Sequence, residues 1–563
     1  MERREGGAIL VECLRALGIR HSFGIPGESY LSVLNALYDT DACRCDINKS
    51  LDFFLCRNEG GAAFMAAAYG KLTGQPGVCF VTRGPGASNA AIGVHTAMQD
   101  SSPMILFVGQ VGTDMKGREA FQEIDYQSFF SGVAKWVVEI DKVNRIPELL
   151  SRAWSVATTG RPGPVVVALP EDVLTCSTRQ SSLTAKPSIT EAAPSPETIQ
   201  AVITSLSRAK RPLILMGDGG WTATGSVALQ RFAEASNIPV LAAFRFQDLY
   251  DNHSFTYVGN AGVGMTASTK ALFSKSDVIL AIGVRLCEMT TDGYTLLSVP
   301  VPRQNLIHVH ASERELGKIY VPNLGVHSSP NTFSSALVEQ TLHGPWDHWR
   351  AAARDAYEAG FDLPKLPGSV DMGFVISHLR ARLPEDAVLT NGAGNFTVWS
   401  NRYFKFGPNQ RLLAPQSGAM GYGIPAAIAA KVARPDATVI CFAGDGDFQM
   451  NCQELGSSMQ AGAQPIVLIL NNGTYGTIRM HQEYSYPGRV SGTMLHNPDF
   501  RRLGEAYGYH TERVEKTEEF AAAFERALGS KTGALLDLNL SAEAITPHKT
   551  LTQIRADAKA ART

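Results

Sequence analysis

Short, continuous runs of apolar residues alternate with stretches of helical periodicity along the chain. The runs that predict strands are GVCFVT (77–82), PMILFVG (103–109), PLILMG (212–217), PVLAAF (239–244), DVILAIG (277–283), NLIHVH (305–310), TVICFAG (438–444) and PIVLIL (465–470). The stretch 87–99 lies between the first two runs and predicts a helix. Continuous apolar strands separated by helices are typical of parallel sheets that are covered on both faces. The pattern therefore predicts an α/β fold of doubly wound parallel sheets.

Two polar segments divide this pattern into three blocks. Residues 177–197 are rich in Ser, Thr and Pro, and residues 360–369 read GFDLPKLPGS. We therefore expect three α/β domains, at 1–180, 190–345 and 365–563. In such sheets ligands bind beyond the carboxyl ends of the strands, so that edge is where functional residues are sought.

Composition and charge exclude several classes of protein. The chain has 563 residues, of which 44% are hydrophobic and 18% charged, which rules out a wholly disordered chain. Lys and Arg total 51 against 53 Asp and Glu, so we expect neither nucleic acid nor an anionic membrane as a partner. No uninterrupted apolar run reaches the roughly 20 residues of a membrane span.

Two further features indicate where the protein works. The apolar positions near the N-terminus are interrupted by Glu12, Cys13 and Arg15, which predicts an amphipathic helix rather than a secretion signal. The nine cysteines form no CxxC pair, and an odd count favours a reducing compartment over a disulfide framework. We therefore expect a cytoplasmic protein.

The most informative stretch is GDGDFQMNCQELGSSMQAGAQPIVLILNNGTYG, at 444–476. One strand ends at Ala443 and is followed at once by Gly444-Asp445-Gly446, and a helix is then expected to run to about Ala461. A second strand ends at Leu470 and is followed by Asn471-Asn472. Asp445 and Asn472 would meet at one edge of neighbouring parallel strands, where their oxygens suit Mg²⁺. The glycines would let backbone N–H groups approach phosphate oxygens. The alternative is a pair of ordinary strand-end turns, since GDG and NNG also form turns.

This arrangement resembles the thiamine diphosphate enzymes, in particular the acetolactate synthase-like group of 2-oxo-acid decarboxylases and carboligases. The resemblance extends over nearly the whole chain and rests on FGIPGES (23–29), RNEGGAAFMAAAYGKLTG (57–74), TRGPGASNA (82–90), AFQEID (120–125), GAMGYGIPAA (418–427), GDGDFQMN (444–451) and NNGTYGTIRMHQE (471–483). It implies pyrimidine-binding, central and diphosphate-binding domains, in that order. It also implies thiamine diphosphate and Mg²⁺ as cofactors.

The resemblance assigns roles at the diphosphate-binding end. The Mg²⁺ ligands would be Asp445, Asn472 and the backbone carbonyl of Thr474. Met420 would wedge between the two cofactor rings and enforce their bent arrangement, whereas the residue pattern alone is equally consistent with a core methionine. The full set implied to bind the cofactor is Gly392, Gly394, Asn395, Met420, Gly446, Asp447, Asn472, Tyr475 and Gly476.

Glu59 is the central catalytic residue that the resemblance implies. Spacing alone favours a carboxylate that caps a helix opening at about Gly60, which stabilises a helix by roughly 0.3–1 kcal/mol. In the resembling enzymes, the Glu of this motif hydrogen-bonds N1′ of the aminopyrimidine and promotes removal of the C2 proton of the cofactor. Such chemistry needs a carboxyl group that shares its proton with the ring.

The substrate side combines a family motif with departures from it. Gln122 would donate to a developing oxyanion or an acceptor carbonyl, with Phe121 as an apolar wall; the alternative for Gln122 is a solvated loop residue. Arg83 replaces a serine and would pair with an anionic substrate group or lie at the surface. Ile478 and His481 occupy positions that usually carry a valine and a tryptophan. Because that tryptophan shapes acceptor choice, His481 argues against branched-chain amino-acid synthesis.

Three functional hypotheses follow from this reading. The leading one is C–C bond cleavage or formation on a 2-oxo acid or 2-hydroxy ketone, with a second carbonyl compound as acceptor. The second is a flavin-dependent oxidoreductase of the pyruvate oxidase type, and the third is a non-catalytic relative. A 2-hydroxyacyl-CoA lyase is a further alternative, because such enzymes share the scaffold. The FAD-binding members of the family carry acidic residues at two places in the central domain. Here these places read His310-Ala311-Ser312 and Gly325-Val326-His327. We therefore expect that this domain binds either no FAD or a different ligand, such as an ADP-like group. The resemblance also implies a homodimer or homotetramer in which two subunits share each active site.

Overall fold

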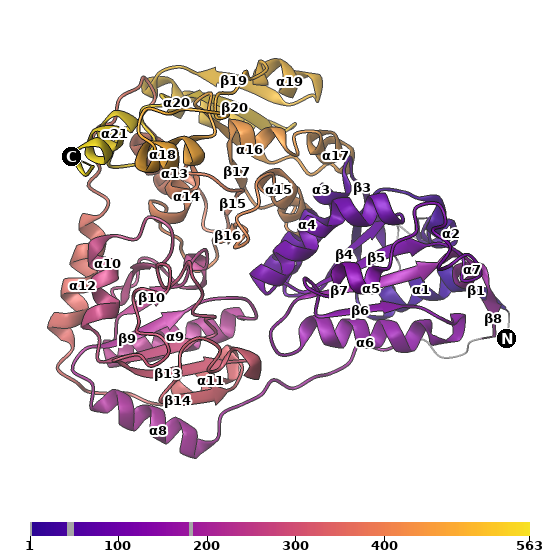
Figure 1. The fold of residues 1–563 in the computed structure, drawn as a ribbon, viewed down its shortest axis with the longest axis horizontal. Coiled ribbons are helices and arrows are strands. Elements are labelled where there is room, and N and C mark those ends of the chain that lie inside the picture. The colour runs from indigo at the N-terminus through magenta and orange to yellow at the C-terminus, as the bar shows by residue number, and fades with distance from the viewer. Residues whose placement is uncertain (1–2, 42–49, 180–183, 563) are drawn as a thin grey trace. The chain divides into compact units, whose positions relative to one another are not determined.

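A computed structural model describes residues 3–41, 50–179 and 184–562. The chain forms two compact units (Figure 1). Unit 1 contains Met1–Thr190, Ile424–Asp436 and Asn451–Gln464, and unit 2 contains Glu191–Gly423, Ala437–Met450 and Pro465–Thr563. Three six-stranded parallel sheets underlie these units, one in unit 1 and two in unit 2, which confirms the predicted α/β fold class. The domain boundaries at 1–180, 190–345 and 365–563 stay a prediction.

The sheet of unit 1 has the strand order β3-β2-β4-β5-β7-β6. Its strands are β2 (His21–Gly24), β3 (Asp52–Leu55), β4 (Gly77–Val81), β5 (Met104–Gln110), β6 (Trp136–Glu139) and β7 (Pro164–Pro170). Its longer helices are α1 (Gly6–Ala16), α2 (Leu31–Asp41), α3 (Glu59–Thr73), α4 (Gly84–Asp100) and α6 (Ile146–Thr158), and the shorter ones are α5 (Tyr126–Phe130) and α7 (Glu171–Thr175). The two-residue strands β1 (Arg4–Glu5) and β8 (Ser177–Thr178) pair separately.

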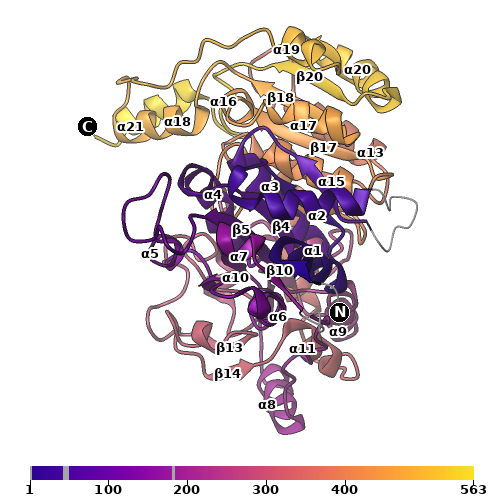
Figure 2. The same cartoon turned by 90° about the vertical axis from the view of Figure 1, so that its right-hand side faces the viewer.

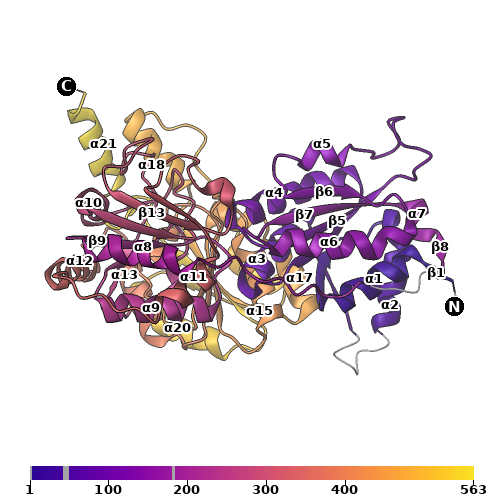
Figure 3. The same cartoon turned by 90° about the horizontal axis from the view of Figure 1, so that it is seen from below.

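Successive side chains of a strand point to opposite faces of the sheet, so the core of unit 1 consists of two layers. Val78 and Phe80 of β4 and Ile105 of β5 pack with α1 and α6 in one cluster. The intervening residues, such as Cys79, are fully buried on the other face, which α3 and α4 cover. Figure 1 shows α4 and α6 on opposite sides of β5 and β7, and Figure 3, seen from below, shows α6 in front of these strands. The continuous apolar runs of the sequence are therefore strands buried on both faces.

The first sheet of unit 2 has the order β11-β10-β9-β12-β13-β14. Its strands are β9 (Pro212–Met216), β10 (Val240–Ala242), β11 (Tyr257–Asn260), β12 (Val278–Ile282), β13 (Asn305–His310) and β14 (Leu324–His327). The accompanying helices are α8 (Pro196–Ser207), α9 (Ala223–Ser236), α10 (Ala267–Lys275), α11 (Pro330–Leu337) and α12 (Asp347–Ala359). Counted within the sheet, this is the order 3-2-1-4-5-6 of dinucleotide-binding folds.

The second sheet of unit 2 has the order β16-β15-β17-β18-β20-β19. Its strands are β15 (Val388–Asn391), β16 (Arg411–Leu413), β17 (Val439–Gly444), β18 (Ile466–Asn471), β19 (His510–Val514) and β20 (Ala534–Asn539). The helices of the same stretch of chain are α13 (Met372–Arg382), α14 (Thr397–Arg402), α15 (Gly423–Ala433), α16 (Asp445–Gln449), α17 (Glu454–Ala461), α18 (Gly476–Ser485), α19 (Phe500–Ala506), α20 (Thr517–Gly529) and α21 (Leu551–Ala560). Figure 2 shows α19 and α20 beside β20.

The sheet of unit 1 and the second sheet of unit 2 share one topology. Counted within each sheet, both run 2-1-3-4-6-5. Strand 1 therefore has strand 2 on one side and strand 3 on the other. In sheets with such a reversal of strand order, ligands bind beyond the carboxyl ends of the two strands at the reversal, here strands 1 and 3. In unit 1 these strands are β2 and β4, and in unit 2 they are β15 and β17.

Several predicted helices can be compared with the structure. The helix expected at 87–99 lies within α4, and the one expected to open at about Gly60 is α3, which begins at Glu59. The amphipathic helix expected near the N-terminus is α1. The single helix expected from the GDG motif to about Ala461 is instead broken into α16 and α17 at residues 450–453, so that prediction was wrong in its continuity. Within the described residues, no helix combines the length and apolar character that crossing a bilayer requires.

A buried ion cluster joins α18 to α21 in unit 2. The Glu483 carboxylate is fully buried and accepts from Arg555 Nε at 2.9 Å and Nη2 at 2.7 Å, and it also pairs with Arg479. The hydrogen bonds from Arg555 hold the pKa of Glu483 down at about 2. Because that pKa is depressed, the stabilisation is present above the unfolded pKa of about 4.3 and is lost as the pH falls toward 2.

Removing this carboxylate should destabilise the fold. We expect Glu483→Gln to lower the free energy of unfolding by about 3–5 kcal/mol, because two guanidinium groups lose their buried partner. Urea denaturation at pH 7 measures the change. Glu525→Gln is the matched control, since Glu525 pairs with Arg382 at an exposed site and should matter far less. Equal effects of the two variants would contradict the assignment of the buried cluster.

Candidate functional site

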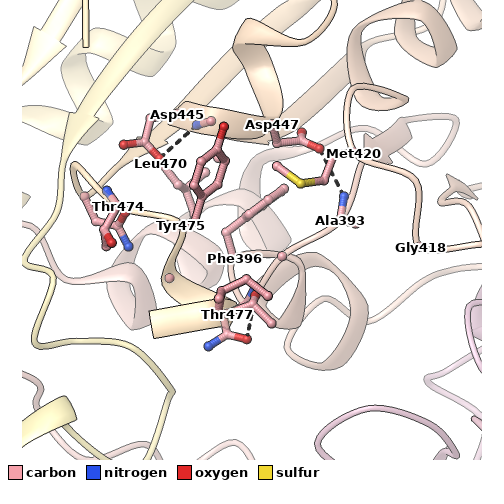
Figure 4. A pocket seen from close by; sticks show the side chains of 17 residues that line it. Ala393, Phe396, Gly418, Met420, Asp445, Asp447, Leu470, Thr474, Tyr475 and Thr477 are labelled. Carbon is pink, nitrogen blue, oxygen red and sulfur yellow. Dashed lines mark hydrogen bonds between the residues drawn. The ribbon is translucent and has the colours of Figure 1, made fainter. Parts of the chain in front are cut away.

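A pocket of about 240 Å³ opens at the carboxyl ends of β15, β17 and β18 in unit 2. It therefore lies at the reversal of strand order in this sheet. Figure 4 shows Thr474 and Asp445 at one end of the pocket and Met420 and Ala393 at the other. The residues that line it are Ala393, Gly394, Asn395, Phe396, Gly418, Met420, Gly444, Asp445, Gly446, Asp447, Leu470, Asn472, Thr474, Tyr475, Gly476, Thr477 and Ile478.

Asp445 joins the ends of β17 and β18. Its Oδ2 accepts from the backbone N–H of Gly473 at 2.8 Å and from Asn497 Nδ2 at 2.7 Å, and its Oδ1 accepts from the N–H of Gly446 at 3.0 Å. Gly473 stands between Asn472 and Thr474, so the three expected metal ligands are brought to one place. The sequence did not single out Asn497, because it reaches Asp445 from a distant loop.

The donor set fits a hard divalent cation. Asp445 is 3% exposed, and it makes no ion pair with any described residue. Burial raises the pKa of its carboxyl group. The described residues that line the pocket include two carboxylates but no lysine or arginine. A diphosphate could bind here only if a cation offset the negative charge, and carboxylate, amide and carbonyl oxygens are the ligands that Mg²⁺ takes.

Asp447 is a second buried carboxyl group in the pocket. Its Oδ1 accepts from the N–H groups of Ala393 at 3.1 Å and Gly421 at 2.9 Å. Burial raises its pKa to about 7. A Cβ at Gly392 would lie 2.0 Å from Oδ1, so only glycine lets the loop 392–395 approach Asp447 this closely. Gly392 thus lets the loop pack against Asp447 but does not itself line the pocket.

The remaining residues expected at the cofactor surround the same cavity. The N–H of Asn395 donates to Thr477 Oγ1 at 2.8 Å, which ties the loop after β15 to the start of α18. A Cβ at Gly446 would lie 2.4 Å from the ring of Tyr475, so that ring packs directly over the GDG turn. Met420 is half-buried in the pocket wall. Phe396 also lines the pocket and was missed, because nothing in its local sequence marks it.

Glu59 lies in unit 1, at the first position of α3. Asn58 caps that helix by accepting from the N–H of Gly60 at 2.8 Å. The Glu59 carboxylate is half-buried and accepts from Asn89 Nδ2 of α4 at 2.9 Å. Since Asn58 already caps the helix, the carboxylate of Glu59 is left to a different partner. Asn89 was not singled out from the sequence, although it stands in the TRGPGASNA motif.

Arg83 is buried in unit 1, with 8% of its surface exposed. Its Nη1 donates to Glu28 Oε1 at 3.2 Å, and its Nη2 contacts Glu171 Oε1. The guanidinium group is therefore held between two carboxylates at the carboxyl edge of the sheet. It does not lie at the surface, and an anionic substrate group would have to compete with these partners.

The other expected substrate residues lie in both units. The carbonyl of Gln122 accepts from the N–H of Gly84 at 2.9 Å, and Gln122 has a φ of 65°. Its neighbour Phe121 is 74% exposed. In unit 2, Ile478 and His481 lie on α18 with exposed side chains, and Ile478 also lines the pocket. The structure thus joins Gln122 to the turn after Arg83, and Ile478 to the cofactor pocket.

The first sheet of unit 2 holds a buried ion pair at its carboxyl edge. Asp218 Oδ2 accepts from Arg285 Nε at 3.2 Å and from its backbone N–H at 2.6 Å, and Asp218 Oδ1 accepts from Gln416 Nε2 at 2.9 Å. His310 ends β13, and its Nδ1 accepts from the N–H of Ser312. The expectation of no FAD at these positions stays a prediction.

Comparison with known proteins identifies the family. Three thiamine pyrophosphate enzyme models match in order: the N-terminal TPP binding domain over residues 4–129, the central domain over 199–337 and the C-terminal TPP binding domain over 392–538. The chain therefore belongs to the thiamine pyrophosphate enzymes and is a thiamine diphosphate-dependent enzyme that acts on small molecules.

Its relatives include acetolactate synthases along almost their full length. The isozyme 2 large subunit of Escherichia coli (strain K12) is 30% identical, with 95% of each chain covered. Acetolactate synthase of Arthrospira platensis is 30% identical, covering 96% of this chain and 95% of the relative. A probable acetolactate synthase large subunit of Methanococcus aeolicus is 31% identical, and the match covers 98% of this chain and 94% of the relative. The chain is acetolactate synthase-like, as the sequence motifs indicated.

Proposed function

We propose that this enzyme uses Mg²⁺ and thiamine diphosphate to cleave and form C–C bonds on a 2-oxo acid or 2-hydroxy ketone. The observation that carries the proposal is the buried Asp445 carboxylate, which accepts from Gly473 and has no cationic partner among the described residues. Asn472 and the carbonyl of Thr474 complete the ligand set. When bound, the cofactor supplies a nucleophilic carbon and an electron sink beside the substrate carbonyl.

The chain's own residues bind and orient the cofactor. The GDG turn and the loop 392–395 offer backbone N–H groups to phosphate oxygens, and Met420 packs at the opposite end of the pocket. Glu59, held by Asn89, shares a proton with N1′ of the aminopyrimidine ring. Gln122 donates to the substrate oxygen, with Phe121 and Ile478 as apolar walls and His481 lining the approach.

The proposal includes an assembly and a location. Glu59 of one subunit acts on the cofactor in the pocket of its partner, so the working form is a homodimer or a homotetramer. The described cysteines are all free thiols, which supports a cytoplasmic enzyme. Sedimentation analysis tests the assembly: a strict monomer with full activity would contradict it.

Product analysis tests the reaction directly. The holoenzyme is incubated with a panel of 2-oxo acids, with and without aldehydes and ketones as acceptors, and products are identified by mass spectrometry. We expect loss of CO₂ from at least one 2-oxo acid and a product that joins its acyl fragment to a carbonyl acceptor. Stoichiometric flavin released on denaturation, together with oxidised products, would favour an oxidase instead. No turnover of any donor would contradict the proposal.

A further inference from the structure

Glu454 is a fully buried carboxylate at the start of α17, within unit 1. Its Oε1 accepts from the backbone N–H of Asn58 at 2.8 Å and from that of Arg57 at 3.1 Å. Its Oε2 accepts from the N–H of Arg57 at 3.2 Å and from Ser457 Oγ at 2.6 Å. This carboxylate therefore binds the main chain of the segment that leads into α3.

A buried carboxylate is energetically costly unless its oxygens accept hydrogen bonds. Both oxygens of Glu454 are satisfied, mostly by backbone N–H groups that are far away in the sequence. Burial raises the pKa of Glu454, and the hydrogen bonds from Ser457 and from the two backbone N–H groups oppose that rise. The guanidinium group of Arg57 turns elsewhere, to the carbonyl of Gly456 and to Gln460. The backbone of residues 57–58 is thus the main partner of Glu454.

The segment that Glu454 holds comes directly before Glu59. Asn58 is the N-cap of α3, and Glu59 is the first residue of that helix. The next turn is also in close contact, since a Cβ at Gly61 would lie 2.5 Å from Glu454 Oε1. Because the start of α3 rests on this carboxylate, the position of Glu59 depends on the length of the Glu454 side chain.

We propose that Glu454 is a positioning residue for Glu59: it fixes the backbone at 57–58, while Asn89 holds the Glu59 carboxyl group. The inference rests on the proposed function, in which Glu59 shares a proton with the cofactor. A displacement of about 1 Å at such a group costs up to roughly 10²-fold in rate. Glu454 is not among the described residues that line the cofactor pocket, and it acts only through the chain that carries Glu59.

Two conservative variants separate position from charge. Glu454→Asp keeps the charge but withdraws the oxygens by one methylene, so they no longer reach both N–H groups. Glu454→Gln keeps the length, and its amide oxygen can take the place of Oε1 opposite Asn58 and Arg57. Ser458→Ala is the matched control, because Ser458 is buried on the same helix and donates instead to the Ala463 carbonyl.

The first measurement needs no cofactor. Backbone amide exchange is followed by mass spectrometry for peptides that contain residues 57 and 58. We expect faster exchange in Glu454→Asp, and wild-type protection in Glu454→Gln and Ser458→Ala. Wild-type protection in Glu454→Asp would overturn the proposed hold on this segment.

The second measurement uses the loaded enzyme. Deuterium exchange at C2 of bound thiamine diphosphate should slow by about 10–100-fold in Glu454→Asp, with near-normal rates in the other two variants. If all three variants slow exchange equally, Glu454 is only structural and the inference fails. If wild-type protein does not accelerate C2 exchange at all, the proposed function fails instead, so the two failures are distinguishable.

Discussion

Replacing Asp445 by alanine is expected to abolish useful binding of thiamine diphosphate. The variant removes the charged member of the proposed Mg²⁺ ligand set from a pocket whose described lining has no basic side chain. The diphosphate would then lie beside Asp447 without a fully held cation. We expect affinity to fall by at least about 100-fold, which is ~2.7 kcal/mol. Calorimetric titration with the cofactor at saturating Mg²⁺ measures the loss.

A second acid in the same unit provides the control for this experiment. Asp499 caps α19 by accepting from the N–H groups of Arg501 and Arg502, outside the residues that line the pocket. Asp499→Ala should weaken that helix and leave cofactor affinity unchanged. Unchanged affinity in Asp445→Ala would refute the assignment of the metal site.

Glu59→Gln should separate catalysis from binding. Glutamine keeps the size of the side chain and an oxygen that can accept from Asn89, but it cannot share a proton with N1′ of the cofactor. General acid–base contributions are typically 10²–10⁴-fold, so exchange at C2 of bound cofactor should slow by at least roughly 10²-fold. Mg²⁺-dependent binding should be largely retained. Quenched NMR of the exchange and calorimetry provide the two measurements.

Glu148→Gln tests the competing explanation for Glu59. Glu148 is also a carboxylate in the first turn of a helix of unit 1, α6, and pairs with Arg145. If Glu59 only stabilised the start of α3, the two variants would behave alike and C2 exchange would continue at the wild-type rate. A selective loss in Glu59→Gln is the result that the proposed function requires.

The sequence predicted the positions of residues best where these positions follow from strand order. Asp445 and Asn472 could be paired because each follows a buried strand, and neighbouring parallel strands end at the same edge. The same reasoning could not find Asn497, whose contact with Asp445 depends on the path of a long loop. It also extended one helix through residues 450–453, since helical periodicity carries no sign of the break between α16 and α17.

Long-range partners explain the remaining differences. Arg83 was expected at a surface or facing an anion, but carboxylates from two distant segments, Glu28 and Glu171, meet it at the edge of the sheet. Glu454 gave no signal because its partners are backbone N–H groups about 400 residues away, and backbone donors leave no trace in side-chain patterns. Such contacts follow from tertiary packing rather than from local sequence.

Each of the two units is assembled from three separate segments of the chain, so neither can be isolated as one continuous fragment. The chain passes from one unit to the other at 190–191, 423–424, 436–437, 450–451 and 464–465. Unit 1 therefore includes most of α15 and all of α17, which are encoded between strands of the last sheet. A fragment cut at the predicted boundary near residue 180 would lack Glu454, so the N–H groups of Arg57 and Asn58 would lose their acceptor. In the remaining chain, α17 would lose its packing against unit 1. The three predicted sequence domains are thus not separable modules, because unit 1 is completed by two segments that the sequence encodes within the last domain.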